Sequence, residues 1–243
     1  MQTNNLNTVQ QKPSLREGGV GFYVIIVAGG SGTRMNNTVP KQFIELHGKP
    51  MLMHTIEKFA KTIPGINIVL VLSPDYRKQW EILCRKYSFE IPFLLTDGGE
   101  TRFHSVKNGL ELTPENCVVG IHDAARPLVN SQTILNAFAT AEQKGNASPA
   151  IPLNESIREV KEISNKSVDR SNYFIVQTPQ CFQSNLIKKA FLQEYRPVFT
   201  DDASVLEAMG EKINLIEGNR ENIKITTHQD LIIAEALLEK GVD

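Results

Sequence analysis

Glycines and positive charges follow an apolar run near the start of the chain, a combination that suits phosphate chemistry. The residues that carry this pattern are Ala28, Gly29, Gly30, Gly32, Arg34 and Lys41. The β-branched and aromatic residues of 22–27 predict a buried strand just ahead of them. Glycine lets the backbone turn sharply and approach a ligand without a Cβ in the way. Backbone amides beside two cations therefore indicate a site for phosphate groups.

Several interpretations compete for this loop. A dinucleotide-binding fingerprint needs a third glycine where Met35 stands, and a helix that Pro40 disfavours. A P-loop needs a Gly-Lys-Ser/Thr ending, which the loop lacks. A tight turn with solvated charges is the plainest alternative. We favour a loop that wraps a nucleoside triphosphate, with Arg34 and Lys41 neutralising its phosphates, because two cations follow the glycines in an α/β pattern.

The rest of the first half alternates apolar runs with segments of helical periodicity. Strands are predicted at 22–27, 66–72, 91–95 and 118–121, and helices at 51–62, 75–87, 101–112 and 131–143, with Ser131 as the N-cap of the last. This order predicts an α/β fold: a Rossmann-like, mostly parallel sheet with helices on both faces. Ligands of such sheets lie beyond the carboxyl ends of the strands. The loops 28–42, 97–102 and 122–127 should therefore converge on one crevice.

The pattern changes after residue 150. Short alternating segments at 157–160 and 173–176 surround a turn at 164–166, which predicts a protruding β-hairpin arm over about 154–177. An isolated hairpin is barely stable in water, so we expect this arm to pack against a second copy of the chain in a homodimer. Thr227–Asp230 resembles a capping box for a final helix at 231–240.

Composition limits the class of protein. The 243 residues can bury one sizeable core, predicted as a single domain over 22–243 after a polar, flexible leader at 1–21. The net charge of −1 argues against a general nucleic-acid binder. No apolar run approaches the ~18–20 residues of a membrane span. Three widely spaced cysteines suggest reduced thiols and a cytoplasmic location.

Seven motifs, in order, resemble those of the 2-C-methyl-D-erythritol 4-phosphate cytidylyltransferase family. They are Ala28–Met35, Pro40–Gln42, Asp97–Arg102, His122–Pro127, Val168–Arg170, Gln177–Gln180 and Asn222–Lys224. The resemblance runs from about Tyr23 to the C-terminus. It implies an enzyme in which the phosphate of 2-C-methyl-D-erythritol 4-phosphate attacks the α-phosphorus of CTP and releases pyrophosphate. Cations and a divalent metal ion, expected to be Mg²⁺, stabilise the charge that develops in such a reaction.

The resemblance also implies roles for individual residues. Arg34 and Lys41 correspond to the pair that stabilises the triphosphate, and Arg170 and Lys224 to the pair that holds the sugar phosphate for attack. In this family the arm crosses to the partner subunit, so Arg170 would complete the neighbouring site. The implied CTP-binding residues are Ala28, Gly29, Gly30, Gly32, Gly99, Glu100, Ser105 and Asp123. The implied substrate-binding residues are Asp123, Arg126, Ser156, Thr178 and Thr200.

Asp123 is also the best single carboxylate for a Mg²⁺ contact, because this hard cation prefers oxygen ligands and uses few protein groups; capping of its own loop is the alternative. His122 beside it is interpreted as a packing or hydrogen-bonding residue. Two functional alternatives stay open. One is a ribitol-5-phosphate cytidylyltransferase, which the Gly29–Gly30 pair allows but Ala124–Ala125 and Val168–Arg170 disfavour. The other is a nucleotide-binding module without turnover.

Overall fold

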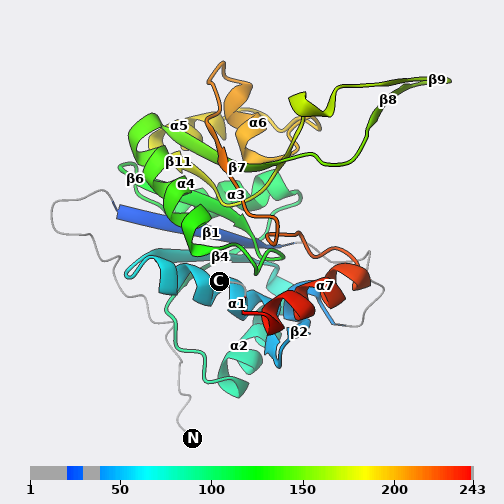
Figure 1. Cartoon of the computed structure of the whole chain (residues 1–243). Helices are drawn as coiled ribbons and strands as arrows, with labels where there is room; N and C mark the ends of the chain where they lie inside the picture. Colours follow the sequence, from blue (N-terminus) through cyan, green and yellow to red (C-terminus); the bar gives the residue numbers. More distant parts are fainter. Residues whose placement is uncertain (1–20, 30–38, 242–243) are drawn as a thin grey trace, which may run out of the picture.

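One eight-stranded, mostly parallel sheet organises the computed structural model, which describes residues 21–29 and 39–241 (Figure 1). The sheet contains β1 (Gly21–Ala28), β4 (Asn67–Leu72), β5 (Leu94–Asp97), β6 (Cys117–Asp123), β7 (Asn146–Pro152), β10 (Phe174–Val176), β11 (Gln180–Gln183) and β12 (Leu215–Glu217). Its order is β5-β4-β1-β6-β11-β7-β10, and β12 also pairs with β7. The predicted α/β class is confirmed. The proposed leader lies outside the described residues, except for Gly21, which begins β1.

The parallel half of the sheet has a reversal of strand order at its centre. β1 pairs in parallel with both β4 and β6, and β4 pairs in parallel with β5. The chain therefore builds outward from β1 to β5 and then returns to place β6 on the other side of β1. β11 joins the sheet antiparallel to β6 and β7. Such a reversal opens a crevice for ligands between the carboxyl ends of the two central strands, here β1 and β6.

Helices cover both faces of the sheet. They are α1 (Met51–Thr62), α2 (Arg77–Lys86), α3 (Arg102–Glu111), α4 (Ser131–Lys144), α5 (Ser184–Ala190), α6 (Asp202–Glu207) and α7 (His228–Glu239). Alternate residues of β1 point to opposite faces. Val24 and Ile26 pack in a core with residues of α1, α2 and α4, whereas Tyr23 and Ile25 pack with residues of α3, α5 and α6. A small hairpin, β2 (Glu45–Leu46) and β3 (Lys49–Pro50), packs near α7.

Local signals place most helix ends to within two residues, but the last helix, predicted at 231–240, begins earlier, at His228. The predicted α1 has the observed bounds, and Thr227 and Asp230 form the predicted capping box of α7. The N-cap of α4 is Asn130 rather than Ser131, because the Asn130 side chain accepts a hydrogen bond from the Thr133 N–H at 2.7 Å. β5 begins at Leu94, after Pro92, which has no N–H for a ladder. In the described part of the chain, no helix is long and apolar enough to cross a bilayer.

A two-stranded arm extends away from the sheet (Figure 1). It is formed by β8 (Arg158–Lys161) and β9 (Ser164–Ser167), with Glu162 and Ile163 at the turn. The prediction of a protruding hairpin is correct, but two of its details are wrong. The predicted turn at 164–166 belongs to β9, and the predicted pairing of 157–160 with 173–176 is not formed. Residues 174–176 form β10, which pairs with β7 in the main sheet. The segment at 173–176 is therefore the return of the chain to the body, and it exposes apolar side chains along the edge of the sheet.

Candidate active site

The carboxyl ends of β1 and β6 lie side by side at the reversal of strand order. Val27 and Asp123 are register partners, and the Ala124 N–H donates to the Val27 carbonyl at 3.1 Å. The loop after β5 joins them, since the Gly98 N–H donates to the Leu72 carbonyl at 3.0 Å. A Cβ added to Gly29 would lie 3.4 Å from the Gly98 Cα. The described parts of the three strand-end loops thus converge, as predicted.

Three of the residues expected to bind CTP meet behind this crevice. The Gly99 N–H donates to the buried Ser105 Oγ at 3.0 Å, and a Cβ on Gly29 would lie 3.1 Å from the same oxygen. A Cβ on Gly99 would lie only 2.4 Å from the His104 Cβ, so no larger residue fits there. Ala28 is buried at the end of β1 and Glu100 is exposed. Glycine at positions 29 and 99 therefore lets the loops after β1 and β5 pack closely on each other and on the start of α3.

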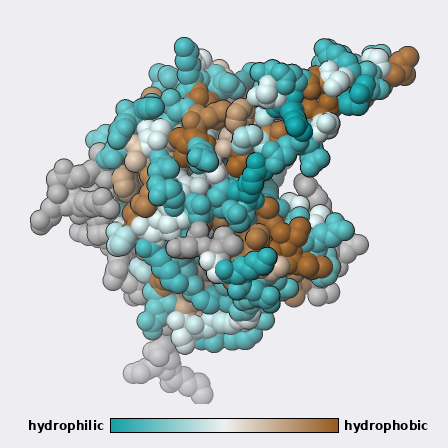
Figure 2. All heavy atoms as spheres, viewed as in Figure 1, coloured by the Kyte–Doolittle hydropathy of each residue, from teal (hydrophilic) through white to brown (hydrophobic). Residues whose placement is uncertain are grey.

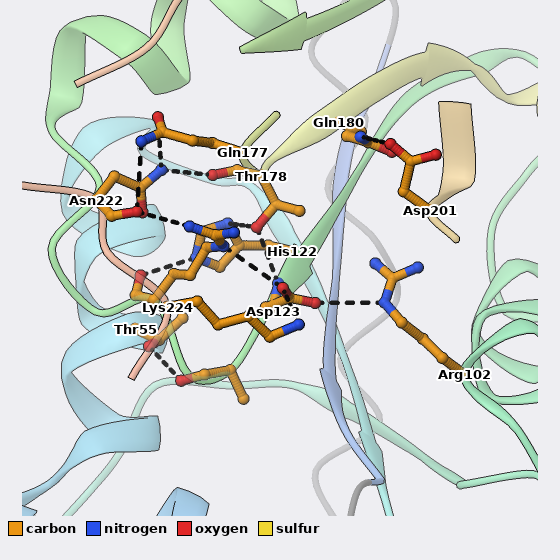
Figure 3. A network of polar contacts seen from close by, with 12 residues as sticks. Thr55, Arg102, His122, Asp123, Gln177, Thr178, Gln180, Asp201, Asn222 and Lys224 are labelled. Atoms are coloured by element: carbon orange, nitrogen blue, oxygen red, sulfur yellow. Dashed lines mark hydrogen bonds and ion pairs between the residues drawn. The ribbon is translucent and has the colours of Figure 1, made fainter. Parts of the chain in front are cut away.

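Asp123 lies at the centre of a cluster of cations at the end of β6. Its Oδ2 is 2.9 Å from the Lys224 Nζ and 3.5 Å from the Arg126 Nε, and its Oδ1 is 3.3 Å from the Arg102 Nε. Lys224 and Arg102 reach the carboxylate from different sides (Figure 3). Burial alone would raise the pKa of Asp123, but Arg102, Lys224 and Arg126 together hold it well below its usual range. Asp123 is therefore ionised at neutral pH.

A hydrogen-bonded segment before α7 presents Lys224 to this carboxylate. The Ile225 N–H donates to the Ala125 carbonyl at 2.9 Å, and the Arg126 Nη1 donates to the Asn222 carbonyl at 2.7 Å. The buried Asn222 side chain donates in turn to the Thr178 carbonyl at 2.8 Å. The Lys224 side chain keeps 44% of its surface exposed. The scaffold thus fixes the backbone of Lys224 and leaves its ammonium group accessible to an anion.

His122 in β6 and Thr178, between β10 and β11, hold Asp123 in place from its buried side. The Thr178 Oγ1 accepts from the Asp123 N–H and lies within hydrogen-bond distance of the His122 Nδ1, both at 3.1 Å. The His122 Nε2 is 3.0 Å from the Arg126 carbonyl, which can only accept. His122 is completely buried, and burial lowers its pKa to about 4. It is a neutral, packed histidine, in agreement with the interpretation from sequence.

This buried histidine should make the fold sensitive to mild acid. An unfolded chain protonates His122 near pH 6.5, whereas the folded chain does so only near pH 4. The free energy of unfolding should therefore fall as the pH drops through this window, by about 2 kcal/mol between pH 7 and pH 5 from this residue alone. Urea unfolding at the two pH values measures the change. In a His122→Gln variant, the fall in unfolding free energy between pH 7 and pH 5 should be smaller by about this amount. An equal fall in both proteins would show that His122 does not cause the pH dependence.

The remaining predicted residues lie apart from this cluster or outside the described residues. Arg170 is exposed and donates to the Asn154 carbonyl at the base of the arm; Ser156 and Thr200 are also exposed. Among the described residues, no ion pair joins Arg170 to Asp123. Lys41 is half-buried at the start of a short 3₁₀ helix (Lys41–Phe43). Gly30, Gly32 and Arg34 lie outside the described residues.

Arg102 and Asp202, for which the sequence predicted no role, form a second ion pair beside Asp123. The Arg102 Nη1 and Nη2 donate to the two carboxylate oxygens of Asp202, at 2.8 and 2.7 Å, and Asp202 is fully buried at the start of α6. Arg102 falls inside the motif Asp97–Arg102, so its motif was recognised but its partners were not. One sequence signal indicates a partner for Arg102: the adjacent acidic residues Asp201 and Asp202 at the start of a short amphipathic segment.

Of the two aspartates in this network, one is accessible to a metal ion. In the ranges 21–29 and 39–241, no group of three His, Cys, Asp or Glu side chains could hold a metal. Asp202 is fully buried and bound through both oxygens by Arg102, whereas the Asp123 side chain keeps 10% of its surface exposed, so Asp123 is the possible ligand. One carboxylate fits Mg²⁺, which is usually bound by one or two carboxylates together with substrate phosphates and water.

Comparisons with known proteins identify the family to which this chain belongs. A family model described as IspD, 2-C-methyl-D-erythritol 4-phosphate cytidylyltransferase, matches residues 22–240. Proteins of that name from Bacteroides thetaiotaomicron and Bacteroides fragilis are 49% and 50% identical to this chain, covering 88% of it and 98% of each relative. A crystal structure of 4-diphosphocytidyl-2C-methyl-D-erythritol synthase from Anaerococcus prevotii superposes with a TM-score of 0.78 at 26% identity, covering 91% of this chain and 97% of that one. The chain therefore belongs to the 2-C-methyl-D-erythritol 4-phosphate cytidylyltransferase family.

Proposed function

We propose that this protein transfers the cytidylyl group of CTP to 2-C-methyl-D-erythritol 4-phosphate, giving 4-diphosphocytidyl-2-C-methyl-D-erythritol and pyrophosphate. The observation that carries the proposal is the group of cations around Asp123 at the crevice between β1 and β6, in a chain of this family. The alternative acceptor, ribitol 5-phosphate, is not favoured, since the family model and the relatives carry the methylerythritol phosphate name.

The chemistry needs charge neutralisation more than proton transfer. The acceptor phosphate is largely dianionic at neutral pH, because the second pKa of a phosphate monoester is about 6. One of its oxygens attacks the α-phosphorus of CTP as the bond to the bridging oxygen of pyrophosphate breaks. Cations must bring the two polyanions together and stabilise the charge on the transferring group. The neutral, buried His122 plays no part as a base in this scheme.

The residues divide between the two substrates. Arg34 and Lys41 act on the triphosphate, and the backbone at Gly29 and Gly99 receives the nucleotide, with Ala28, Gly30, Gly32, Glu100 and Ser105 around it. Lys224 holds the acceptor phosphate, supported by Arg126 and by the Thr178 hydroxyl beneath Asp123. The exposed hydroxyls of Ser156 and Thr200 serve the sugar from the arm and from the loop before α6.

Mg²⁺ is proposed as the cofactor, with Asp123 as its protein ligand. When bound, it would neutralise charge on the phosphates of CTP. Asp123 would then share its oxygens between the metal and the cations that now contact it. A cytoplasmic location is also proposed, and the three free thiols of Cys84, Cys117 and Cys181 support it.

We further propose a homodimer joined through the arm. Val160 and Ile163 on the arm expose 71% and 102% of their surface, and residues 173–176 at its base expose between 38% and 49% each. Figure 2 shows this apolar surface at the end of the arm. Exposed apolar side chains on a thin hairpin and at its base are typical of a surface that a partner covers. Arg170 would then enter the site of the partner subunit.

Mixed dimers can test that assignment. Arg170→Ala should raise KM for the acceptor phosphate by about 10-fold or more, because a charge-assisted contact is lost. Co-expression of an Arg170→Ala chain with a Lys224→Met chain should restore about half of the wild-type activity per mixed dimer. One site then has Lys224 from one chain and Arg170 from the other, and the second site has neither. Mixed dimers no more active than the single variants would place both residues in one chain.

The proposed activity is tested by product formation. The full chain, CTP, Mg²⁺ and 2-C-methyl-D-erythritol 4-phosphate should give a cytidine diphosphate conjugate, detected by mass spectrometry, and one equivalent of pyrophosphate. CTP should be preferred over ATP, GTP and UTP. Absence of product with every nucleotide would overturn the proposal and favour a binding module without turnover.

A further inference from the structure

Arg102 joins two carboxylates from different parts of the fold, and this geometry gives it a role in the reaction. We propose that Arg102 is a positioning residue that fixes the orientation of Asp123 and, through it, the place of the Lys224 ammonium group. The inference rests on the proposed function, in which Lys224 holds the acceptor phosphate. Arg102 itself need not touch either substrate.

The anchor of Arg102 is rigid. Its two terminal nitrogens bind the Asp202 carboxylate at 2.8 and 2.7 Å, a bidentate arrangement that fixes the plane of the guanidinium group. Asp202 is fully buried at the start of α6, which Asp201 caps by accepting from the Ser204 N–H at 2.9 Å. A buried side chain at a capped helix end has little freedom to move.

A second set of hydrogen bonds fixes that helix end to the sheet. The buried Gln180 of β11 donates to the Asp201 Oδ2 at 2.7 Å and accepts from the Ala203 N–H at 2.9 Å. Figure 3 shows Gln180 and Asp201 on the same side of the sheet as Arg102. The position of the Arg102 guanidinium is thus set by β11 and α6 as well as by its own place at the start of α3.

The remaining nitrogen of the Arg102 guanidinium, Nε, contacts one of the two Asp123 oxygens, so the two oxygens have different partners. The Arg102 Nε contacts Oδ1 at 3.3 Å, while Oδ2 is left to Lys224 at 2.9 Å and Arg126 at 3.5 Å. Without the contact to Oδ1, the carboxylate could rotate about its Cβ–Cγ bond, and the flexible Lys224 side chain would follow it. We infer that Oδ1 fixes the orientation of the carboxylate through Arg102, and that Oδ2 positions the cations that face the acceptor phosphate.

An Arg102→Lys variant separates this role from a purely structural one. Lysine keeps the positive charge beside buried Asp202, but a single ammonium group cannot reproduce the planar fork that reaches both carboxylates. We expect kcat/KM for the acceptor phosphate to fall by about 10-fold or more. Loss of the bidentate contact to buried Asp202 should lower the thermal midpoint, but the variant should stay folded at the assay temperature. Arg85→Lys, at an exposed position in the last turn of α2, is the matched control and should leave kcat/KM unchanged.

The decisive measurement is a double-mutant cycle with Asp123→Asn, with product followed by mass spectrometry so that slow variants can be ranked. If Arg102 acts through Asp123, Arg102→Lys should change kcat/KM by less than about 3-fold in the Asp123→Asn background. An equal, additive loss in both backgrounds would overturn the proposal. So would a loss in Arg102→Lys that is matched by a comparable loss of folded protein at the assay temperature.

A structural measurement, which does not depend on catalytic activity, tests the positioning role separately from the proposed function. In crystal structures, the Lys224 Nζ–Asp123 Oδ2 pair of the wild type, at 2.9 Å here, should open beyond hydrogen-bond distance in Arg102→Lys. An unchanged pair would overturn the positioning role. An opened pair in a protein that makes no product would support the positioning role and reject the proposed function instead.

Discussion

Replacing Lys224 with methionine is expected to lower kcat/KM for the acceptor phosphate by about 10²–10³-fold, the usual effect of removing one group that stabilises a charged transition state. Lys224 keeps 44% of its side chain exposed while its backbone neighbours are hydrogen-bonded, so the ammonium group can be removed without disturbing the fold. Asp123 would still contact Arg102 and Arg126. Steady-state kinetics with varied acceptor at saturating CTP measures the effect.

A matched control for this substitution is Lys144→Met, at an exposed position in the last turn of α4. It should leave kcat/KM for the acceptor and KM for CTP unchanged. If Lys224→Met were as active as this control, Lys224 would have no part in holding the acceptor. A loss confined to the CTP side would instead assign Lys224 to the nucleotide.

Asp123→Asn is expected to damage both the fold and the reaction. The substitution removes the negative charge that Arg102, Arg126 and Lys224 share, and leaves these cations close together at a buried position. Breaking a buried ion pair from one side costs about 3–5 kcal/mol, and we expect a loss of unfolding free energy of that order. The amide cannot act as an anionic metal ligand, so activity should fall by about 10²-fold or more even at temperatures where the variant is folded.

Urea unfolding of the wild type and of Asp123→Asn measures the first effect, and product formation measures the second. Asp75→Asn is a suitable control, because Asp75 is exposed in a surface 3₁₀ turn (Pro74–Tyr76) and its side chain accepts from the Ser73 hydroxyl at 3.4 Å, a contact that an amide oxygen keeps. A stability of Asp123→Asn within about 1 kcal/mol of the wild type would show that the three cations do not depend on this carboxylate.

The parallel half of the fold could be predicted because its signals are local. Apolar runs such as 66–72 and helical spacing such as 51–62 require no knowledge of distant partners, and parallel strands bring their carboxyl-end loops together by topology. The glycine pattern selected Gly29, and the family resemblance added Gly99, Ser105, Asp123, Arg126, Thr178 and Lys224. The structure brings these residues to the strand ends around β1 and β6.

The pairing of the arm could not be predicted, because strand pairing is decided by tertiary contacts. Residues 174–176 alternate like one half of a hairpin, yet they pair with β7, which offers a longer and better packed partner than β8. Arg102 was missed for a related reason. Its place near the start of a helix, predicted at 101–112, is visible in the sequence. Its partner Asp202 lies 100 residues away, and only the folded chain brings them together.

The central claim is the transfer of a cytidylyl group to methylerythritol phosphate, and a paired acceptor assay tests it most directly. The full chain is incubated with CTP and Mg²⁺ and either 2-C-methyl-D-erythritol 4-phosphate or ribitol 5-phosphate, and pyrophosphate and the cytidine conjugate are quantified. We predict rapid, stoichiometric formation of both products with methylerythritol phosphate and a far slower reaction with ribitol phosphate. Faster turnover of ribitol phosphate, or no turnover of either acceptor, would contradict it.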